Sequence, residues 1–233
     1  MNNLRVDAAG EVLWLLPEGA VWWPAGRTVF AADLHLGKGA AFRAQGQAVP
    51  AGSSARTLAR LESLVAAQGA ARLVVLGDFW HGPQGLTPSL LAAVASFGQR
   101  VPTVLVLGNH DRRIHPDGLP LEVSTHALPM GPLLAAHEPP PPGAAGFTLA
   151  GHWHPAVSLR SRAGDRLRRP CFVRYPHALV LPAFGGLTGA LTMELGELAR
   201  DQAEVAVLGE GRLHWLPLPA RDAGPGPGGG AGW

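Results

Sequence analysis

The strongest constraint on the fold of this chain is a series of short apolar runs that stop abruptly at a glycine or a polar residue. Each run is apolar along nearly its whole length, as in strands that are buried on both faces of a sheet. The runs occupy residues 12–16, 28–32, 72–76, 103–107, 133–136 and 147–150. Helical spacing of apolar residues predicts a helix over 53–68, and Thr87–Pro88 begins a second over 87–97. This alternation indicates an α/β fold in which neighbouring strands are parallel.

The part of the chain after Pro139 is predicted to be mainly β structure. Short apolar runs continue there at 157–159, 171–173, 178–181, 189–193, 205–207 and 213–215. We expect one domain over residues 1–222, because 233 residues with 47% hydrophobic content can bury a large core and no linker interrupts them. Residues 223–233 are rich in Gly and Pro and have almost nothing to bury, which predicts a disordered tail.

Cysteine content and charge bear on the compartment and on partners. Cys171 is the single cysteine and cannot form an internal disulfide, and the chain begins without a signal-like segment, so we expect a cytoplasmic protein. Residues 175–193 carry no Asp, Glu, Lys or Arg, but prolines and glycines interrupt them, and no membrane span is expected. A net charge of +2 only weakly favours anionic partners.

Residue types that bind metals follow five of the apolar runs. Asp33 and His35 are two residues apart, and extended residues at that spacing point to one face of a sheet. The carboxyl ends of parallel strands share an edge, where open α/β sheets place their sites. Each short motif alone is weak evidence for a metal site, but five such motifs in order after successive apolar runs are strong evidence for one. The candidate ligands are Asp33, His35, Asp78, Asn109, His137, His152 and His154.

This set of side chains suits two divalent metals that together bind a water and lower its pKa. One metal would take Asp33, His35 and His154, the other would take Asn109, His137 and His152, and Asp78 would bridge them. Oxygen and nitrogen ligands without thiolate indicate Mn, Fe or Zn, and ligand type does not choose among these. The remaining positive charge favours an anionic substrate such as a phosphate ester. His110 is the candidate for stabilising the leaving group, with Asp111 fixing its tautomer.

These motifs carry a resemblance to a known family. Asp33-Leu34-His35, Gly77-Asp78, Gly108-Asn109-His110-Asp111, His137 and Gly151-His152-Trp153-His154 resemble, in order, the five motifs of calcineurin-like metallophosphoesterases. The resemblance implies a four-layer α/β/β/α sandwich, a dinuclear metal centre and hydrolysis of phosphomonoesters or phosphodiesters.

A narrower resemblance rests on two further segments. Residues 32–38 with Phe42-Arg43 and 46–50, and residues 182–189 near the C-terminus, are similar to the bacterial ligase-associated DNA-damage-response metallophosphoesterases. This similarity implies a phosphodiesterase acting as an endonuclease on nucleic acid, with DNA as the expected substrate and Mn as the expected metal. It also implies an association with a DNA ligase and helicase system.

Basic residues near the motifs are candidates for binding substrate, although each could be a solvated surface charge. Lys38 and Arg43 are expected on a loop that holds a second phosphate, and Arg112 and Arg113 could grip a phosphate bidentately. His81 could contact substrate. The arginines after the last ligand pair could follow a polynucleotide backbone; they are Arg160, Arg162, Arg166, Arg168, Arg169 and Arg174.

Two other functions remain open at this stage. A phosphatase or phosphodiesterase for a small nucleotide would have a closed pocket and would not cleave a plasmid. A metallophosphoesterase fold can also serve only as a binding scaffold, but a scaffold needs neither the complete ligand set nor His110. The sequence therefore favours a metal-dependent phosphodiesterase.

Overall fold

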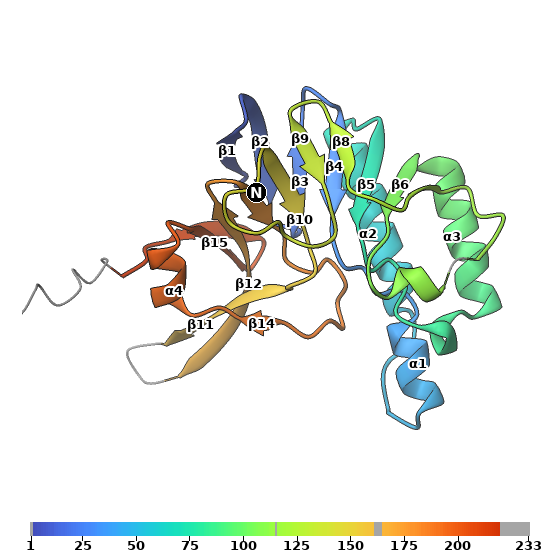
Figure 1. The fold of residues 1–233 in the computed structure, drawn as a ribbon. Helices are drawn as coiled ribbons and strands as arrows, with labels where there is room; N and C mark the ends of the chain where they lie inside the picture. Colours follow the sequence, from blue (N-terminus) through green and yellow to red (C-terminus); the bar gives the residue numbers. More distant parts are fainter. Residues whose placement is uncertain (1, 115, 161–164, 220–233) are drawn as a thin grey trace, which may run out of the picture.

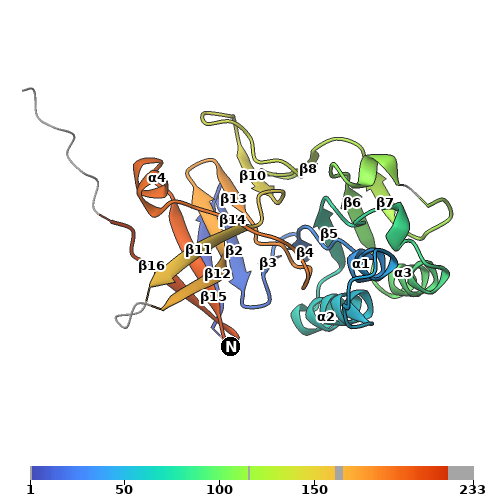
Figure 2. The ribbon, with the colours of Figure 1, turned by 90° about the horizontal axis from the view of Figure 1, so that it is seen from below.

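The chain folds into two sheets that pack face to face, with helices on their outer surfaces (Figure 1). The computed structural model describes residues 2–114, 116–160 and 165–219, so the predicted tail at 223–233 lies outside the described residues. Figure 2 shows α1, α2 and α3 gathered beside β5 and β6, and α4 on the opposite side of the molecule. The layers run in the order helix, sheet, sheet, helix, as expected for the α/β/β/α sandwich.

The first sheet has the strand order β1-β2-β3-β4-β5-β6-β7. Pairing is antiparallel from β1 to β4 and parallel from β4 to β7, which confirms the predicted parallel strands. The bounds are β1 Leu4–Ala8, β2 Glu11–Leu16, β3 Ala20–Trp23, β4 Thr28–Ala31, β5 Arg72–Leu76, β6 Thr103–Val106 and β7 Glu122–Ser124.

Two helices cover the outer face of this sheet. They are α2 (Ser53–Gln68), between β4 and β5, and α3 (Pro88–Arg100), between β5 and β6. The apolar face of α2 packs with Val94 and Phe97 of α3 onto the sheet. Helix α3 begins as its sequence indicates, because the Thr87 hydroxyl accepts a hydrogen bond from the Leu90 amide at 3.2 Å and Pro88 occupies the first turn.

The second sheet has the order β14-β11-β12-β13-β10-β9-β8, and β12 also pairs with the β15–β16 hairpin. Its outer face is covered in part by the short helix α4, through Leu198. The bounds are β8 Leu128–Met130, β9 Leu133–Ala135, β10 Phe147–Ala150, β11 Pro155–Arg160, β12 Arg166–Tyr175, β13 Ala178–Val180, β14 Leu191–Thr192, β15 Glu204–Gly209, β16 Arg212–Leu216 and α4 Leu195–Arg200.

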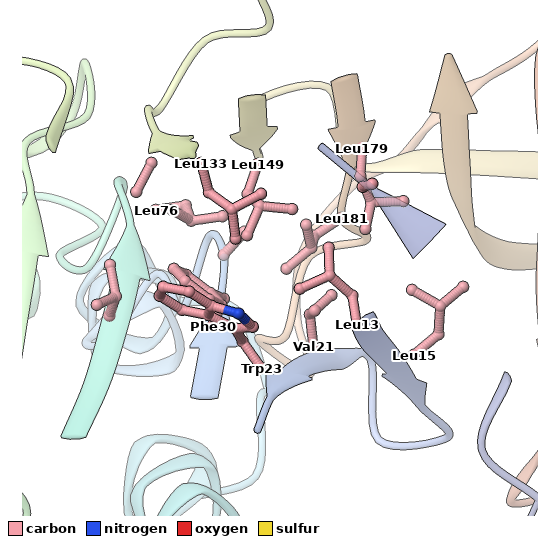
Figure 3. Close-up of a cluster of buried hydrophobic side chains, with 14 of the residues drawn as sticks. Leu13, Leu15, Val21, Trp23, Phe30, Leu76, Leu133, Leu149, Leu179 and Leu181 are labelled. Carbon is pink, nitrogen blue, oxygen red and sulfur yellow. The ribbon is translucent and has the colours of Figure 1, made fainter. Parts of the chain in front are cut away.

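The main core lies between the two sheets (Figure 3). Phe30 and Leu76 of the first sheet face Leu149 and Leu179 of the second, and all four side chains are fully buried. This explains why the predicted strands are apolar on both faces: each central strand contacts helices on one side and the other sheet on the other. None of the helices within the described residues is long and apolar enough to cross a membrane.

Three features of the fold differ from the sequence-based expectation. Residues Lys38–Ala44 form helix α1 instead of a loop, consistent with their content of Ala and other helix formers. Strand β12 starts at Arg166, well before the predicted 171–173, because its arginine-rich half pairs with β11. Strands β9 and β10 belong to the second sheet, so the five motifs come from two sheets that meet and not from one edge of one sheet.

Candidate active site

The candidate ligands meet where the ends of β4, β5 and β6 approach the ends of β9 and β10. Backbone hydrogen bonds join the loops that carry them. The Asp33 amide donates to the Gly77 carbonyl at 3.1 Å, and the His35 amide donates to the Asp78 carbonyl at 2.9 Å. Across the sheets, the His152 amide donates to Asp33 Oδ2 at 2.9 Å. The two sheets are therefore held together at the site by its own residues.

The backbone at most of these positions is left-handed. Positive φ values are found at Asp33 (53°), His35 (44°), Asp78 (49°), His152 (69°) and His154 (47°). The expectation that Asp33 and His35 converge because they are extended is therefore wrong: β4 ends at Ala31, and a left-handed turn brings the two side chains together. Such backbone is costly for residues with a Cβ and occurs mostly at functional sites.

One group of ligand atoms comes from Asp33, His35, Asp78 and His154, all within 4.8 Å of one another. Asp33 Oδ1 lies 3.3 Å from His154 Nε2. His35 Nε2 lies 3.3 Å from His154 Nε2 and 3.8 Å from Asp78 Oδ2. This is the set expected for the first metal, with Asp78 at its border.

A second group comes from Asp78, His137 and His152, again within 4.8 Å. Asp78 Oδ1 lies 3.6 Å from His137 Nε2, and His152 Nδ1 lies 3.0 Å from the same nitrogen. The Asn109 amide is 3.5 Å from His152 Nδ1. Each oxygen of Asp78 thus faces a different group, which would allow this carboxylate to bridge two metals.

In two of the histidines, a hydrogen bond to a backbone carbonyl determines which ring nitrogen is free to bind a metal. His137 Nδ1 is 3.0 Å from the Leu76 carbonyl, and His154 Nδ1 is 3.0 Å from the Gly189 carbonyl. A carbonyl can only accept, so Nδ1 donates in both rings and Nε2 is left to bind a cation. Sequence reasoning did not identify these carbonyl partners, because a backbone acceptor has no signature in residue identity.

The chemistry of this donor set fits divalent metals. Asp33 Oδ1 and His35 Nδ1 are buried without a hydrogen bond in the described part of the chain. Burial, together with the charges of His154, His110, Lys38 and His81, lowers the pKa of His35 to about 2, so the ring is neutral and able to coordinate. Burial opposes the protonation of His154, but the attraction of Asp33, whose Oδ1 lies 3.3 Å from its Nε2, outweighs burial and raises the pKa of His154. The neutral His35 and Asp33 Oδ1 can therefore coordinate a divalent cation.

His110 lies beside the ligands at the open side of the site. Its Nε2 is 4.0 Å from Asp78 Oδ2, and its side chain is 42% exposed. Its Nδ1 lies 2.7 Å from the His81 carbonyl, so Nδ1 donates to that oxygen. The other nitrogen, Nε2, is therefore directed toward the site, where a substrate could reach it.

Asp111 does not have the position expected of a partner for His110. Its carboxylate is fully buried and accepts hydrogen bonds from three backbone amides, those of Phe79 (3.2 Å), Trp80 (3.0 Å) and Gly108 (2.9 Å). Burial raises the pKa of Asp111, while these amides oppose the increase. The His81 carbonyl orients the His110 ring instead, and Asp111 ties the loop after β5 to the loop after β6.

The structure brings some of the candidate substrate-binding residues to the site and leaves others outside it. Burial is the main cause that lowers the pKa of His35 and of His81, and the charge of the nearby Lys38 adds to it. Burial also lowers the pKa of Lys38 itself. The His81 ring stacks on His110 at 5.7 Å between centroids. Arg43 donates instead to the carbonyls of Val49 and Pro50, at 3.3 and 3.2 Å.

The two arginines after Asp111 are only partly described. Arg112 and Arg113 follow Asp111 in a short 3₁₀ turn, in which Arg112 is exposed. The side chain of Arg113 is outside the described residues. Of the arginines after the last ligand pair, Arg162 is also outside them, and Arg166, Arg168 and Arg169 lie on β12.

Comparison with known proteins agrees with this geometry. A family model described as calcineurin-like phosphoesterase matches residues 26–163, which is more than half of the chain. The crystal structure of the Pseudomonas putida nuclease MPE is similar with a TM-score of 0.76 and 33% identity, covering 92% of this chain and 100% of that one. This relative is a nuclease, as the narrower sequence resemblance predicts.

Other comparisons add less. Yfce, a phosphoesterase from E. coli, is 15% identical with a TM-score of 0.40, covering 82% of this chain and 99% of that one. No relative is found among curated proteins. From the family match, the nuclease relative and the paired groups of ligands, this chain belongs to the calcineurin-like phosphoesterase family and is a metal-dependent phosphoesterase.

Proposed function

We propose that this protein is a phosphodiesterase that cleaves nucleic acid, with DNA as its substrate and two Mn ions as its cofactor. The observation that carries the proposal is the pair of ligand groups that share Asp78, beside an accessible His110. The similarity to a nuclease over 92% of the chain supports a polynucleotide substrate. Damage repair alongside a DNA ligase and helicase, in the cytoplasm, is the setting that the sequence resemblance and the single cysteine favour.

We assign different roles in hydrolysis to the residues of the site. Asp33, Asp78, Asn109 and the four histidines proposed as ligands would hold two divalent metals. When bound, these metals would supply an activated water and neutralise charge on the phosphate. His110 keeps one proton on Nδ1 through the His81 carbonyl, and a second proton, on Nε2, would pass to the oxygen that leaves phosphorus. Lys38 adds positive charge near His81 and His35.

The test compares a small diester with a polymer. The purified protein is treated with a chelator and then assayed with bis-p-nitrophenyl phosphate and with supercoiled plasmid, with and without added Mn. Cleavage of both that returns only with Mn supports the nuclease proposal, and parallel additions of Fe and Zn test the choice of metal. Turnover of the small diester with an intact plasmid would favour a small nucleotide as substrate. Inactivity toward both substrates with all three metals would favour a scaffold.

A further inference from the structure

A groove with a volume of about 660 Å³ lies on the outer face of the second sheet. It is bounded by the β11–β12 hairpin on one side and the β15–β16 hairpin on the other. Strand β12 pairs with β11 through Pro170 and with β15 only from Cys171 onward, so the two hairpins separate beyond that point. Helix α4 covers the same face further along, through its Leu198. The groove thus lies on the part of this sheet face that α4 does not cover.

The floor of the groove is apolar and accessible. Leu159 and Leu167 are cross-strand partners and therefore point to the same face, and Leu167 is 47% exposed. Val207 and Leu216 continue the floor across the β15–β16 hairpin. Leu167 thus leaves apolar surface in water that a ligand with flat apolar faces would cover, while Val207 is buried and Leu159 and Leu216 are half-buried.

The walls of the groove are mainly basic. Arg169 is the cross-strand partner of Val157, and Arg212 is the partner of Gly209, so both side chains are on the groove face. Glu210 is the acidic residue among the lining residues. Arg166 and Arg168 are exposed on the other face of the same strand and add to the positive charge of the hairpin. An anionic chain with apolar groups matches both the walls and the floor.

The groove lies on strands that follow the last candidate ligand in the chain. Strand β11 begins at Pro155, immediately after His154, and the groove residue Arg169 pairs at Val157. At a rise of about 3.3 Å per residue, Arg169 lies roughly 10 Å along the strand from the last candidate ligand. Phosphates along one nucleic-acid strand are at least about 3.4 Å apart. Arg169 therefore lies within about three nucleotides of a phosphate bound at the site.

We propose that this groove binds a single strand of nucleic acid and holds the part of the substrate that lies a few nucleotides from the cleaved bond. Arg169 and Arg212 bind phosphates, as the basic grooves of other single-strand sites do, and the leucine floor contacts the apolar faces of unstacked bases. A duplex would keep its bases stacked and away from this floor. The inference rests on the nuclease function proposed above, and it specifies how that function selects a polymer.

The experiment uses the Mn-loaded full-length protein and the double variant Arg169→Glu/Arg212→Glu. Cleavage of a long oligothymidylate is compared with hydrolysis of bis-p-nitrophenyl phosphate, which is too small to reach the groove. We expect KM for the oligonucleotide to rise about tenfold with little change in kcat, and the efficiency ratio of the two substrates to fall accordingly. The slope of log kcat/KM against log salt should decrease by roughly 1.4, since each phosphate contact with a single strand contributes about 0.7.

Arg27→Glu is the matched control, because Arg27 is exposed just before β4 and its side chain donates to the Gly69 carbonyl at 3.1 Å, away from the groove residues. If the wild-type protein and the double variant had equal KM values for the oligonucleotide, the groove would not bind the substrate strand. The proposed nuclease function would be unaffected by that result. A wild-type protein that hydrolyses only the small diester would overturn the nuclease function itself. A change in molar mass by light scattering without a change in KM would make the groove a contact between copies of the chain and overturn the inference.

Discussion

At the scale of single residues, the site is built from side chains on unusual backbone. Asp33, Asp78 and His154 have positive φ values of 53°, 49° and 47°, which a residue with a Cβ adopts only at a cost. Their identity and order are visible in the sequence, and Asp78 belongs to two of the three groups of described side chains that could hold a metal; the division into two metal sites stays a prediction. The left-handed turns are not visible, because tertiary hydrogen bonds such as His152 amide to Asp33 impose them.

Replacement of His110 by alanine tests the division between binding metal and assisting the leaving group. His110→Ala should lower kcat on bis-p-nitrophenyl phosphate by roughly 10²–10⁴-fold, the usual contribution of a positioned acid or base. Metal content, measured by elemental analysis, should stay at the wild-type value because His110 is not among the proposed ligands. His126→Ala is the control, since the exposed His126 contacts its neighbour Thr125. If His110→Ala had wild-type turnover, His110 would not assist the leaving group. If the variant lost metal, His110 would be a metal ligand.

Replacement of Asp111 by asparagine tests its role in joining two loops. The carboxylate accepts three backbone hydrogen bonds, and an amide would turn a donor toward at least one of those N–H groups. Asp111→Asn should therefore lower the free energy of unfolding by roughly 1–3 kcal/mol in urea denaturation. Asp117→Asn, at an exposed position, should change it by less than about 0.5 kcal/mol. Equal stability of the two variants would mean that the buried carboxylate does not join the loops.

At the scale of elements, the sequence predicts the central strands and long helices better than the short helix α1 or the sheet to which a strand belongs. Strands β5 and β6 and helices α2 and α3 agree closely with expectation, because periodicity and caps are local signals. Helix α1 was expected as a loop, since its seven residues are too few for periodicity to show. Membership of β9 and β10 in the second sheet depends on long-range pairing, on which the local pattern carries no information.

The turn after β5 offers a sharp test of how elements position ligands. Gly77 has a φ of +79°, and a Cβ there would overlap the His137 ring. Gly77→Ala should displace His137 and lower metal content below the wild-type value, with a large loss of activity. Gly69→Ala is the matched control, since Gly69 also has a positive φ of +60° but nothing lies within 4 Å of an added Cβ. That variant should cost only about 1–2 kcal/mol of stability and keep its metals. Equal metal content in both variants would contradict the steric explanation.

At the scale of the whole molecule, the site joins the two halves of the sandwich. Asp33, His35, Asp78 and Asn109 follow strands of the first sheet, whereas His137, His152 and His154 follow strands of the second. The buried core between the sheets holds them face to face, and the ligands close one edge of that interface. A cation that binds both sets stabilises the folded chain over the unfolded one, where the ligands are dispersed.

Metal binding should therefore raise the thermal midpoint of the entire chain. At a metal concentration of about 100 Kd, each site contributes about 2.7 kcal/mol, or roughly 5–10 °C for a chain of this size. Scanning calorimetry with Mn and with excess chelator measures the difference. Asp78→Ala should abolish it and lose both metals together, because each oxygen of Asp78 faces a different group. A variant that still binds two equivalents and gains the same stability would mean that Asp78 does not bridge and that each sheet holds its own metal.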